Sequence, residues 1–184
     1  LVISGGKAFG LVHDGGTGRH EGLVAHGNGD AAVWAQGMQS FEVTGTGTPL
    51  GRNRYAGIVV LDPVALTIRD AVVEDTRWGC HDCGSTAARD AADGIQIIRP
   101  RAGAALANLM LRNNERVGLL LDLGGGAMDG MSMAGIEVYG TGEQFGAVAQ
   151  NGDVSAAWDT DITRSGETGI TDYGTREILT IAGH

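Results

Sequence analysis

The chain has 184 residues, of which 42% are hydrophobic and 19% charged, and its formal net charge is −9. It is too apolar for a disordered segment, and its length suits one domain. Lys and Arg total 13 against 22 Asp and Glu, so a nucleic-acid partner is not expected. No apolar run reaches the roughly 18 residues that a membrane-spanning helix needs, so membrane insertion is not expected either.

Short apolar segments led by glycine recur along the chain. Each has the alternation of a short β-strand, and the glycine permits a tight turn in front of it. The lead glycines are between 23 and 37 residues apart, which lies within the range of solenoid repeats, about 20 to 50 residues. These lead segments are Gly22–Ala25, Gly57–Val60, Gly94–Ile97, Gly118–Leu121, Gly146–Ala149 and Gly169–Asp172.

A second, shorter apolar segment follows each lead segment. Its first residue is Ser, Asp, Asn or Gly, which are residue types that suit a sharp corner of the backbone. The second segments are Ser40–Val43, Asp70–Val73, Asn108–Leu111, Gly135–Val138 and Asp159–Ile162. Apolar residues shortly before them indicate a third strand, at Met38, Ile68, Leu106, Met133 and Ala157. We therefore predict about six stacked coils of three short strands each, sharing one core.

The two patterns resemble those of the right-handed parallel β-helix family, the architecture of pectate lyases, many polysaccharide epimerases and numerous bacterial surface proteins. The resemblance covers nearly the whole chain and implies a single all-β solenoid domain over residues 1–184. It also implies an exported protein, in the periplasm, at the cell surface or outside the cell. Both ends of the chain resemble the last strand of a coil, which predicts a segment of a longer solenoid or end-to-end self-association.

Three connections in the first half of the chain are longer than the later ones. They run from Ile3 to Gly22, from Val43 to Gly57 and from Val73 to Gly94, and predict long loops at one corner of the first coils. Loops on a rigid scaffold often carry functional sites. The candidates for acid–base chemistry are His13, His20, His81, Asp14, Glu21 and Asp82. The candidates for ligand binding are Tyr55, Trp78, Arg52, Arg54 and His26.

The lead segments also predict an outer and an inner face, because side chains alternate along a strand. Inward positions such as Ile58 and Ile97 are expected to be core. Outward positions such as Val24, Val59 and Leu120 are apolar, which predicts a contact surface covered by loops or by a partner. Uronate chemistry would need clustered carboxylates and cations on this face, and a single aspartate there does not supply them.

Cys80 and Cys83 form the only Cys-x-x-Cys pair. It could be a disulfide loop, half of a metal site or a redox couple. The second cysteine pair of a zinc site is missing, and the βαβ context of a redox couple is absent from the pattern. We predict the disulfide, which implies an oxidising compartment. No metal or other cofactor is predicted, with calcium left open because Asn and Asp gather in turns such as Asn28–Asp30.

These features predict a non-catalytic extracellular or surface scaffold for binding or assembly. A polysaccharide or another surface protein would be its partner. Two alternatives stay open. One is a polysaccharide-active enzyme of the lyase, hydrolase or epimerase type with its site at the long-loop corner, and the other is a self-assembling fibre or adhesin segment.

Overall fold

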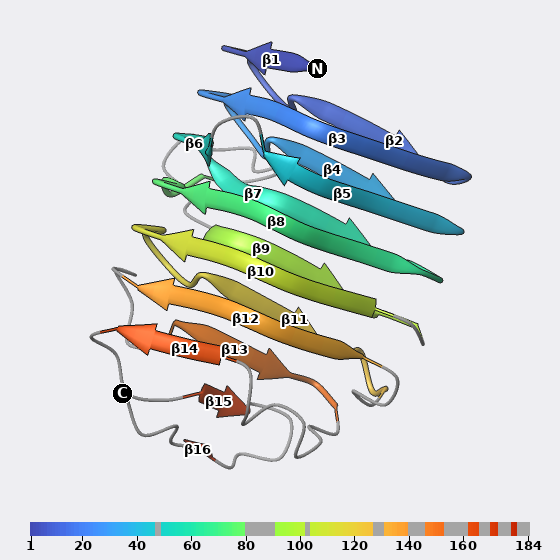
Figure 1. The fold of residues 1–184 in the computed structure, drawn as a ribbon, viewed down its shortest axis with the longest axis vertical. Coiled ribbons are helices and arrows are strands. Elements are labelled where there is room, and N and C mark those ends of the chain that lie inside the picture. The colour runs from blue at the N-terminus through green and yellow to red at the C-terminus, as the bar shows by residue number, and fades with distance from the viewer. Residues whose placement is uncertain are drawn as a thin grey trace.

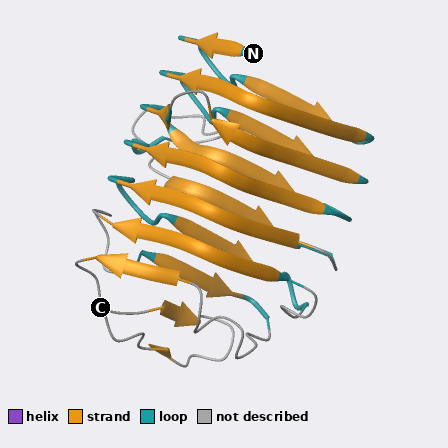
Figure 2. Ribbon diagram, in the orientation of Figure 1, coloured by secondary structure: helices purple, strands orange, loops and turns teal. Residues whose placement is uncertain are grey.

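The strands of the protein stack as a parallel β-solenoid. In the computed structural model, residues 1–46, 49–79, 91–101, 104–126, 131–139 and 146–152 are described, together with the backbone of three further short strands. All regular structure in these residues is β, with no helix (Figure 2). Two sheets lie one behind the other, and their strands run in opposite directions (Figure 1). The predicted all-β solenoid is therefore confirmed.

Sheet A has the order β1-β3-β5-β8-β10-β12-β14, with β6 beside β3 and β8. Its strands are β1 (Val2–Ser4), β3 (Thr17–His26), β5 (Ser40–Thr46), β6 (Leu50–Gly51), β8 (Leu66–Glu74), β10 (Ala104–Arg112), β12 (Ser132–Tyr139) and β14 (Ile162–Ser165). Sheet B consists of β2 (Leu11–Asp14), β4 (Val33–Gln36), β7 (Tyr55–Leu61), β9 (Ala92–Ile98), β11 (Leu119–Asp122), β13 (Ala147–Gln150), β15 (Ile170–Asp172) and β16 (Ile178–Leu179). Only β15 and β16 pair antiparallel within these two sheets. No helix of the described residues is long and apolar enough to cross a membrane.

The long strands of sheet A contain a residue with a left-handed backbone part-way along. Asp70, Asn108 and Gly135 have φ of 55°, 51° and 63°, and the strand register stacks them one above the other. Gly22 and Gly45, with φ of 61° and 65°, continue this corner column through β3 and β5. Asp70, Asn108 and Gly135 were predicted as corners from their residue types, whereas the corner of β5 was predicted at Ser40 and lies at Gly45. The third strand expected at Ile68, Leu106 and Met133 is the first arm of β8, β10 and β12, joined to the second arm through the corner column, whereas Met38 lies in the turn before β5 and Ala157 lies outside the described residues.

The prediction for the first coils is wrong in one respect. Gly22–Ala25 lies in β3 of sheet A, where Val24 pairs with Val2. The sheet B strand of that coil is β4, which follows Ala32 and has no lead glycine. The reason is that a left-handed corner and a tight turn both favour glycine, so the same pattern precedes strands of either sheet.

The same correction removes the first of the three predicted long loops. The stretch from Ile3 to Gly22 contains β2 and the first arm of β3. Ser40–Val43 also belongs to a first arm, because Val43 pairs with Ile68 and the corner of β5 is at Gly45. The histidines of this stretch are therefore strand residues with fixed neighbours.

The core follows the predicted alternation. Leu23 and Ala25 of sheet A are fully buried. The predicted inward residues of sheet B are also fully buried: Ile58, Val60, Ile95, Ile97, Leu119, Leu121, Ala147 and Ala149. The outward residues Val59, Leu120 and Val148 are also buried, with 0%, 9% and 4% of their surface exposed. Ala31 and Ala56 pack against Val59, and Val117 packs against Leu120 and Val148. The predicted apolar contact surface is thus covered by the chain itself at these positions.

A ladder of buried asparagines supports the turns that leave sheet A. Asn53 Oδ1 accepts hydrogen bonds from the Asn28 backbone N–H at 3.1 Å and from Asn28 Nδ2 at 2.9 Å. Asn28 Oδ1 in turn accepts from the Gly6 N–H at 3.1 Å. Asn114 Oδ1 accepts from the Thr76 N–H at 3.2 Å. These side chains satisfy backbone groups that a buried turn would otherwise leave unpaired.

Thr76 occupies the ladder position between Asn53 and Asn114. Gly51 pairs with Glu74, and backbone hydrogen bonds continue the same register through the turns that follow. Thr76 is fully buried, and its Oγ1 has no hydrogen-bond partner among the described residues. Thr76→Asn would supply the missing amide between its neighbours. We expect this substitution to raise the free energy of unfolding by about 1 kcal/mol, the net worth of one hydrogen bond, as measured by urea denaturation.

Thr76→Val is the matched control for this prediction, because it removes the unpaired hydroxyl and adds no amide. If Thr76→Val stabilises the protein as much as Thr76→Asn does, the gain comes from removing the hydroxyl and the ladder explanation fails.

Candidate binding groove on sheet A

An open groove of about 340 Å³ lies on the outer face of sheet A, along the corner column. It crosses β8, β10 and β12, so it runs parallel to the solenoid axis. Its lining consists of Asp70, Ala71, Val72, Asn108, Leu109, Met110, Gly135 and Glu137. Because neighbouring parallel strands are about 4.8 Å apart, the groove presents similar positions at the spacing of the coils.

A hydrogen bond between two coils holds the centre of the groove. Asn108 Nδ2 donates to Asp70 Oδ1 at 2.9 Å. Arg69 NH1 lies 3.7 Å from the other carboxylate oxygen of Asp70, and the Asp70 side chain is 46% exposed. The left-handed backbone at both positions places these short side chains at the corner. The carboxylate is thus oriented by its neighbours and still reachable from solvent.

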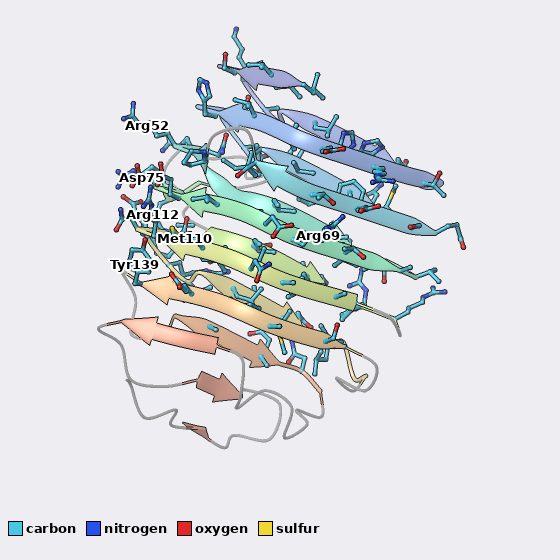
Figure 3. The ribbon with its side chains drawn as sticks, in the orientation of Figure 1. Arg52, Arg69, Asp75, Met110, Arg112 and Tyr139 are labelled. Atoms are coloured by element: carbon cyan, nitrogen blue, oxygen red, sulfur yellow. The ribbon has the colours of Figure 1, made fainter. Side chains whose placement is uncertain are left out.

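One rim of the groove is formed by the ends of β8, β10 and β12. Arg112 Nε donates to Glu74 Oε2, and Arg112 NH1 lies 3.5 Å from the Tyr139 hydroxyl. The Tyr139 hydroxyl first, and then the Glu74 carboxylate, raise the pKa of Arg112. Figure 3 shows Arg112, Met110 and Tyr139 gathered at this end of the front sheet. The rim therefore offers a phenol and a guanidinium whose charge is balanced by Glu74.

The opposite side of the groove carries a chain of ion pairs across β3, β5 and β8. Glu42 lies between two arginines, 3.4 Å from Arg19 and 3.6 Å from Arg69. Each arginine side chain is largely exposed. Arg19, Arg69 and Arg112 are each paired with a carboxylate, and the ionisable residues of the described lining, Asp70 and Glu137, are acidic. An anionic ligand would meet like charge there.

The sequence-predicted binding residues divide into two groups. Arg54 and Trp78 lie in the turns beside sheet B, where Arg54 Nε donates to the Trp78 carbonyl at 3.2 Å, and Tyr55 is the first residue of β7. The Tyr55 ring lies 6.3 Å from Trp34. These three residues lie outside the lining of the groove.

His26 and Arg52 lie at the end of the sheet A strands, since His26 pairs with Gly51. Both are exposed. Figure 3 places Arg52 on the same edge of sheet A as Arg112 and Tyr139. Arg52 therefore extends the rim of the groove towards the N-terminal coils.

The candidates for acid–base chemistry are brought together only in part. His13 of β2 and His20 of β3 face each other, with their Nε2 atoms 2.7 Å apart. Asp14 and Glu21 are the next residues along their strands, and both are exposed on the outer faces. His81 and Asp82 lie outside the described residues. For the enzyme alternative, these two strands therefore supply a pair of histidines, and neither strand supplies a carboxylate that faces the pair.

A buried ion pair lies beside sheet B. Arg116 donates two hydrogen bonds to the Asp93 carboxylate, one of them at 2.6 Å, and Gln96 Nε2 donates a third at 2.9 Å. Burial, opposed by the Arg116 hydrogen bonds, raises the pKa of Asp93 above that of a solvated aspartate. The hydrogen bond to Asp93 explains why Gln96 is tolerated at a buried outward position of β9.

The predicted disulfide between Cys80 and Cys83 lies outside the described residues and stays a prediction. In the part of the chain that the structure describes, no three His, Cys, Asp or Glu residues are arranged to hold a metal ion. The acidic oxygens bind groups of the protein itself: Asp30 Oδ1 accepts from the Ala31 N–H, Asp122 Oδ1 accepts from the Gly124 N–H, and Asp122 Oδ2 accepts from Gln150 and Asn151 in the next coil. Hydrogen bonds within turns and between coils thus account for these oxygens.

The groove residues were not predicted as a site. Asp70, Asn108 and Gly135 were expected at corners, and alternation would have placed Met110 and Glu137 on the outer face two residues further on. Applying the outer-face argument to the second segments as well as to the lead segments would have found them. Comparisons with protein-family models, with curated proteins and with solved structures find no significant match to this chain.

Proposed function

We propose that this β-solenoid is a non-catalytic binding scaffold and that its ligand is a neutral polysaccharide lying along the groove of sheet A. The observation that carries the proposal is the groove itself, which crosses three coils and combines hydrogen-bonding side chains with an apolar floor. An extended polymer parallel to the solenoid axis would meet related groups in successive coils. An extracellular or cell-surface location is part of the proposal.

The chemistry of the lining favours sugars over other polymers. Asp70, Asn108 and Glu137 provide acceptors and a donor for hydroxyl groups, while Val72 and Met110 provide apolar surface for the face of a sugar ring. The described residues of the lining include no basic side chain, which disfavours uronates and nucleic acid. We therefore expect neutral glycans to bind and polyuronates not to bind.

Asn108→Gly tests the proposal without straining the backbone. Glycine keeps the left-handed conformation, as Gly135 does in the next coil, while the amide that holds Asp70 is lost. Loss of one or two polar contacts is expected to weaken binding of a soluble neutral glucan or mannan about tenfold. Isothermal titration calorimetry or affinity electrophoresis against a panel of neutral glycans and polyuronates would measure this.

Asn113→Gly is the matched control, because Asn113 is also an exposed asparagine with a left-handed backbone, φ 54°, and lies outside the groove lining. It should leave glycan affinity unchanged. Equal weakening by both variants, or binding of polyuronates in preference to neutral glycans, would contradict the proposal.

A further inference from the structure

Two columns of inward side chains, one in each sheet, are apolar in the later coils that the structure describes and contain a histidine in the first coil. The strand register places His13 in one column with Ala35, Val60, Ile97 and Leu121. It places His20 in one column with Val43, Ile68, Leu106 and Met133. Two histidines thus occupy positions that are occupied by buried hydrophobic residues in the coils below.

These two histidines are in direct contact with each other and with the core. Their Nε2 atoms are 2.7 Å apart, which requires one ring to donate a proton and the other to accept it. Both rings pack on Phe41, with centroid distances of 5.6 Å and 6.0 Å. A Cβ at Gly18 would lie 3.1 Å from Phe41 and 3.3 Å from His13, so a glycine leaves room for the three rings. Both histidines are partly buried.

We propose that the His13–His20 pair is a proton-operated latch, which closes the first coil at neutral pH and releases it when both rings are protonated. With one proton between the two Nε2 atoms, the rings are joined by a hydrogen bond. With a proton on each, neither nitrogen can accept, and two positive charges meet above an apolar ring. The coil that contains β2 and the first arm of β3 would then separate from β4 and β5.

Among the described residues around the pair, none provides a countercharge inside the coil. β4 contributes no ionisable residue, and β5 presents Phe41 inward while Glu42 lies on the outer face with Arg19. On their own strands, Asp14, Arg19 and Glu21 are exposed on the outer faces. The repulsion between the two protonated rings is therefore relieved when the coil opens.

The direction of the pH effect follows from His20. Burial, and then the nearby His13, lower the pKa of His20 in the folded protein. An unfolded histidine takes up its proton at about pH 6.5, whereas the folded His20 takes it up only at lower pH. The closed coil is therefore stable above about pH 6.5 and loses stability as the pH falls below that value.

Hydrogen exchange at pH 7.5 and pH 5.0, with EDTA present, tests the latch. Exchange must be expressed as protection relative to the intrinsic rate at each pH. We expect protection of the amides in 11–20 to fall on the order of tenfold at the lower pH, while the amides in 58–61 keep theirs. Equal protection of 11–20 at both pH values would overturn the inference.

The variant with both His13→Leu and His20→Leu should abolish the response, since leucines occupy these two columns at Leu121 and Leu106. His26→Gln is the matched control, because His26 is exposed at the other end of β3 and should leave the response intact. A double variant that still opens at pH 5.0 would contradict the latch.

An NMR titration of the histidine rings of the unaltered protein gives an independent test, which does not depend on whether the double variant folds. His20 is expected to titrate below about 6.5, the value of a solvated histidine. A midpoint at or above that value would overturn the inference.

Discussion

Replacing Phe41 by alanine is expected to lower the free energy of unfolding by about 3 to 5 kcal/mol, the usual cost of truncating a buried phenylalanine. Phe41 is fully buried and is among the largest buried side chains of the described core. Its ring fills the space above β5 that Gly18 leaves open, and it supports the histidine pair. Urea denaturation followed by circular dichroism would measure the loss.

The loss should be localised as well as large. In a solenoid each coil contacts only its neighbours, so the amides of β2, β3 and β4 should lose protection from hydrogen exchange before those of β9 and β11. Phe41→Leu, which keeps most of the apolar volume, should cost clearly less. If Phe41→Ala costs under about 1 kcal/mol, the packing of the first coils is not as described.

Replacing Asn53 by alanine is expected to cost about 3 kcal/mol. The substitution removes the acceptor of two hydrogen bonds from Asn28, one from its backbone N–H and one from its amide. It also removes the donor to the Ala25 carbonyl. Each buried polar group that is left without a partner costs about 1 to 3 kcal/mol, and both asparagines are almost fully buried.

The exposed Gln39 is a suitable control for Asn53, since it lies in the turn between β4 and β5. Gln39→Ala should change the free energy of unfolding by less than about 0.5 kcal/mol. A similar small effect for Asn53→Ala would mean that the asparagine ladder adds little to the stability of the turns.

The sequence was sufficient to predict the solenoid, because the repeated alternation determines which residues can be buried together. Ile58, Ile97 and Leu121 were expected in the core and are fully buried. The corner residues Asp70 and Asn108 were also expected, since their side-chain types tolerate the left-handed backbone that they adopt. Strand alternation and tolerance of a left-handed backbone are local conformational preferences, and such preferences can be deduced from a single sequence.

The assignment of strands to sheets could not be deduced in the same way. Gly22 lies at the corner within a strand of sheet A and Gly57 lies within a strand of sheet B, yet the residues that follow them have the same alternation. The sheet B strand after Ala32 has no glycine to mark it. The difference between the two sheets lies in which strand each segment pairs with, and pairing is not encoded within four residues.

The groove and the asparagine ladder depend on contacts between coils. Asn108 and Asp70 are 38 residues apart, and Asn28 and Asn53 are 25 apart. The sequence separations differ because the connections differ in length. Predicting these pairs would have required the register of every coil, and one misassigned strand shifts that register by a whole turn. The same misassignment hid the histidine pair, because His13 and His20 were expected in a loop.

Mapping of a neutral oligosaccharide on the protein by NMR amide shifts tests the central claim most directly. Our account predicts that the shifts concentrate on Asp70, Asn108, Met110 and Glu137, along the groove of sheet A. Shifts concentrated instead at Arg54, Tyr55 and Trp78 beside sheet B, or no shifts with any neutral glycan at millimolar concentration, would contradict it.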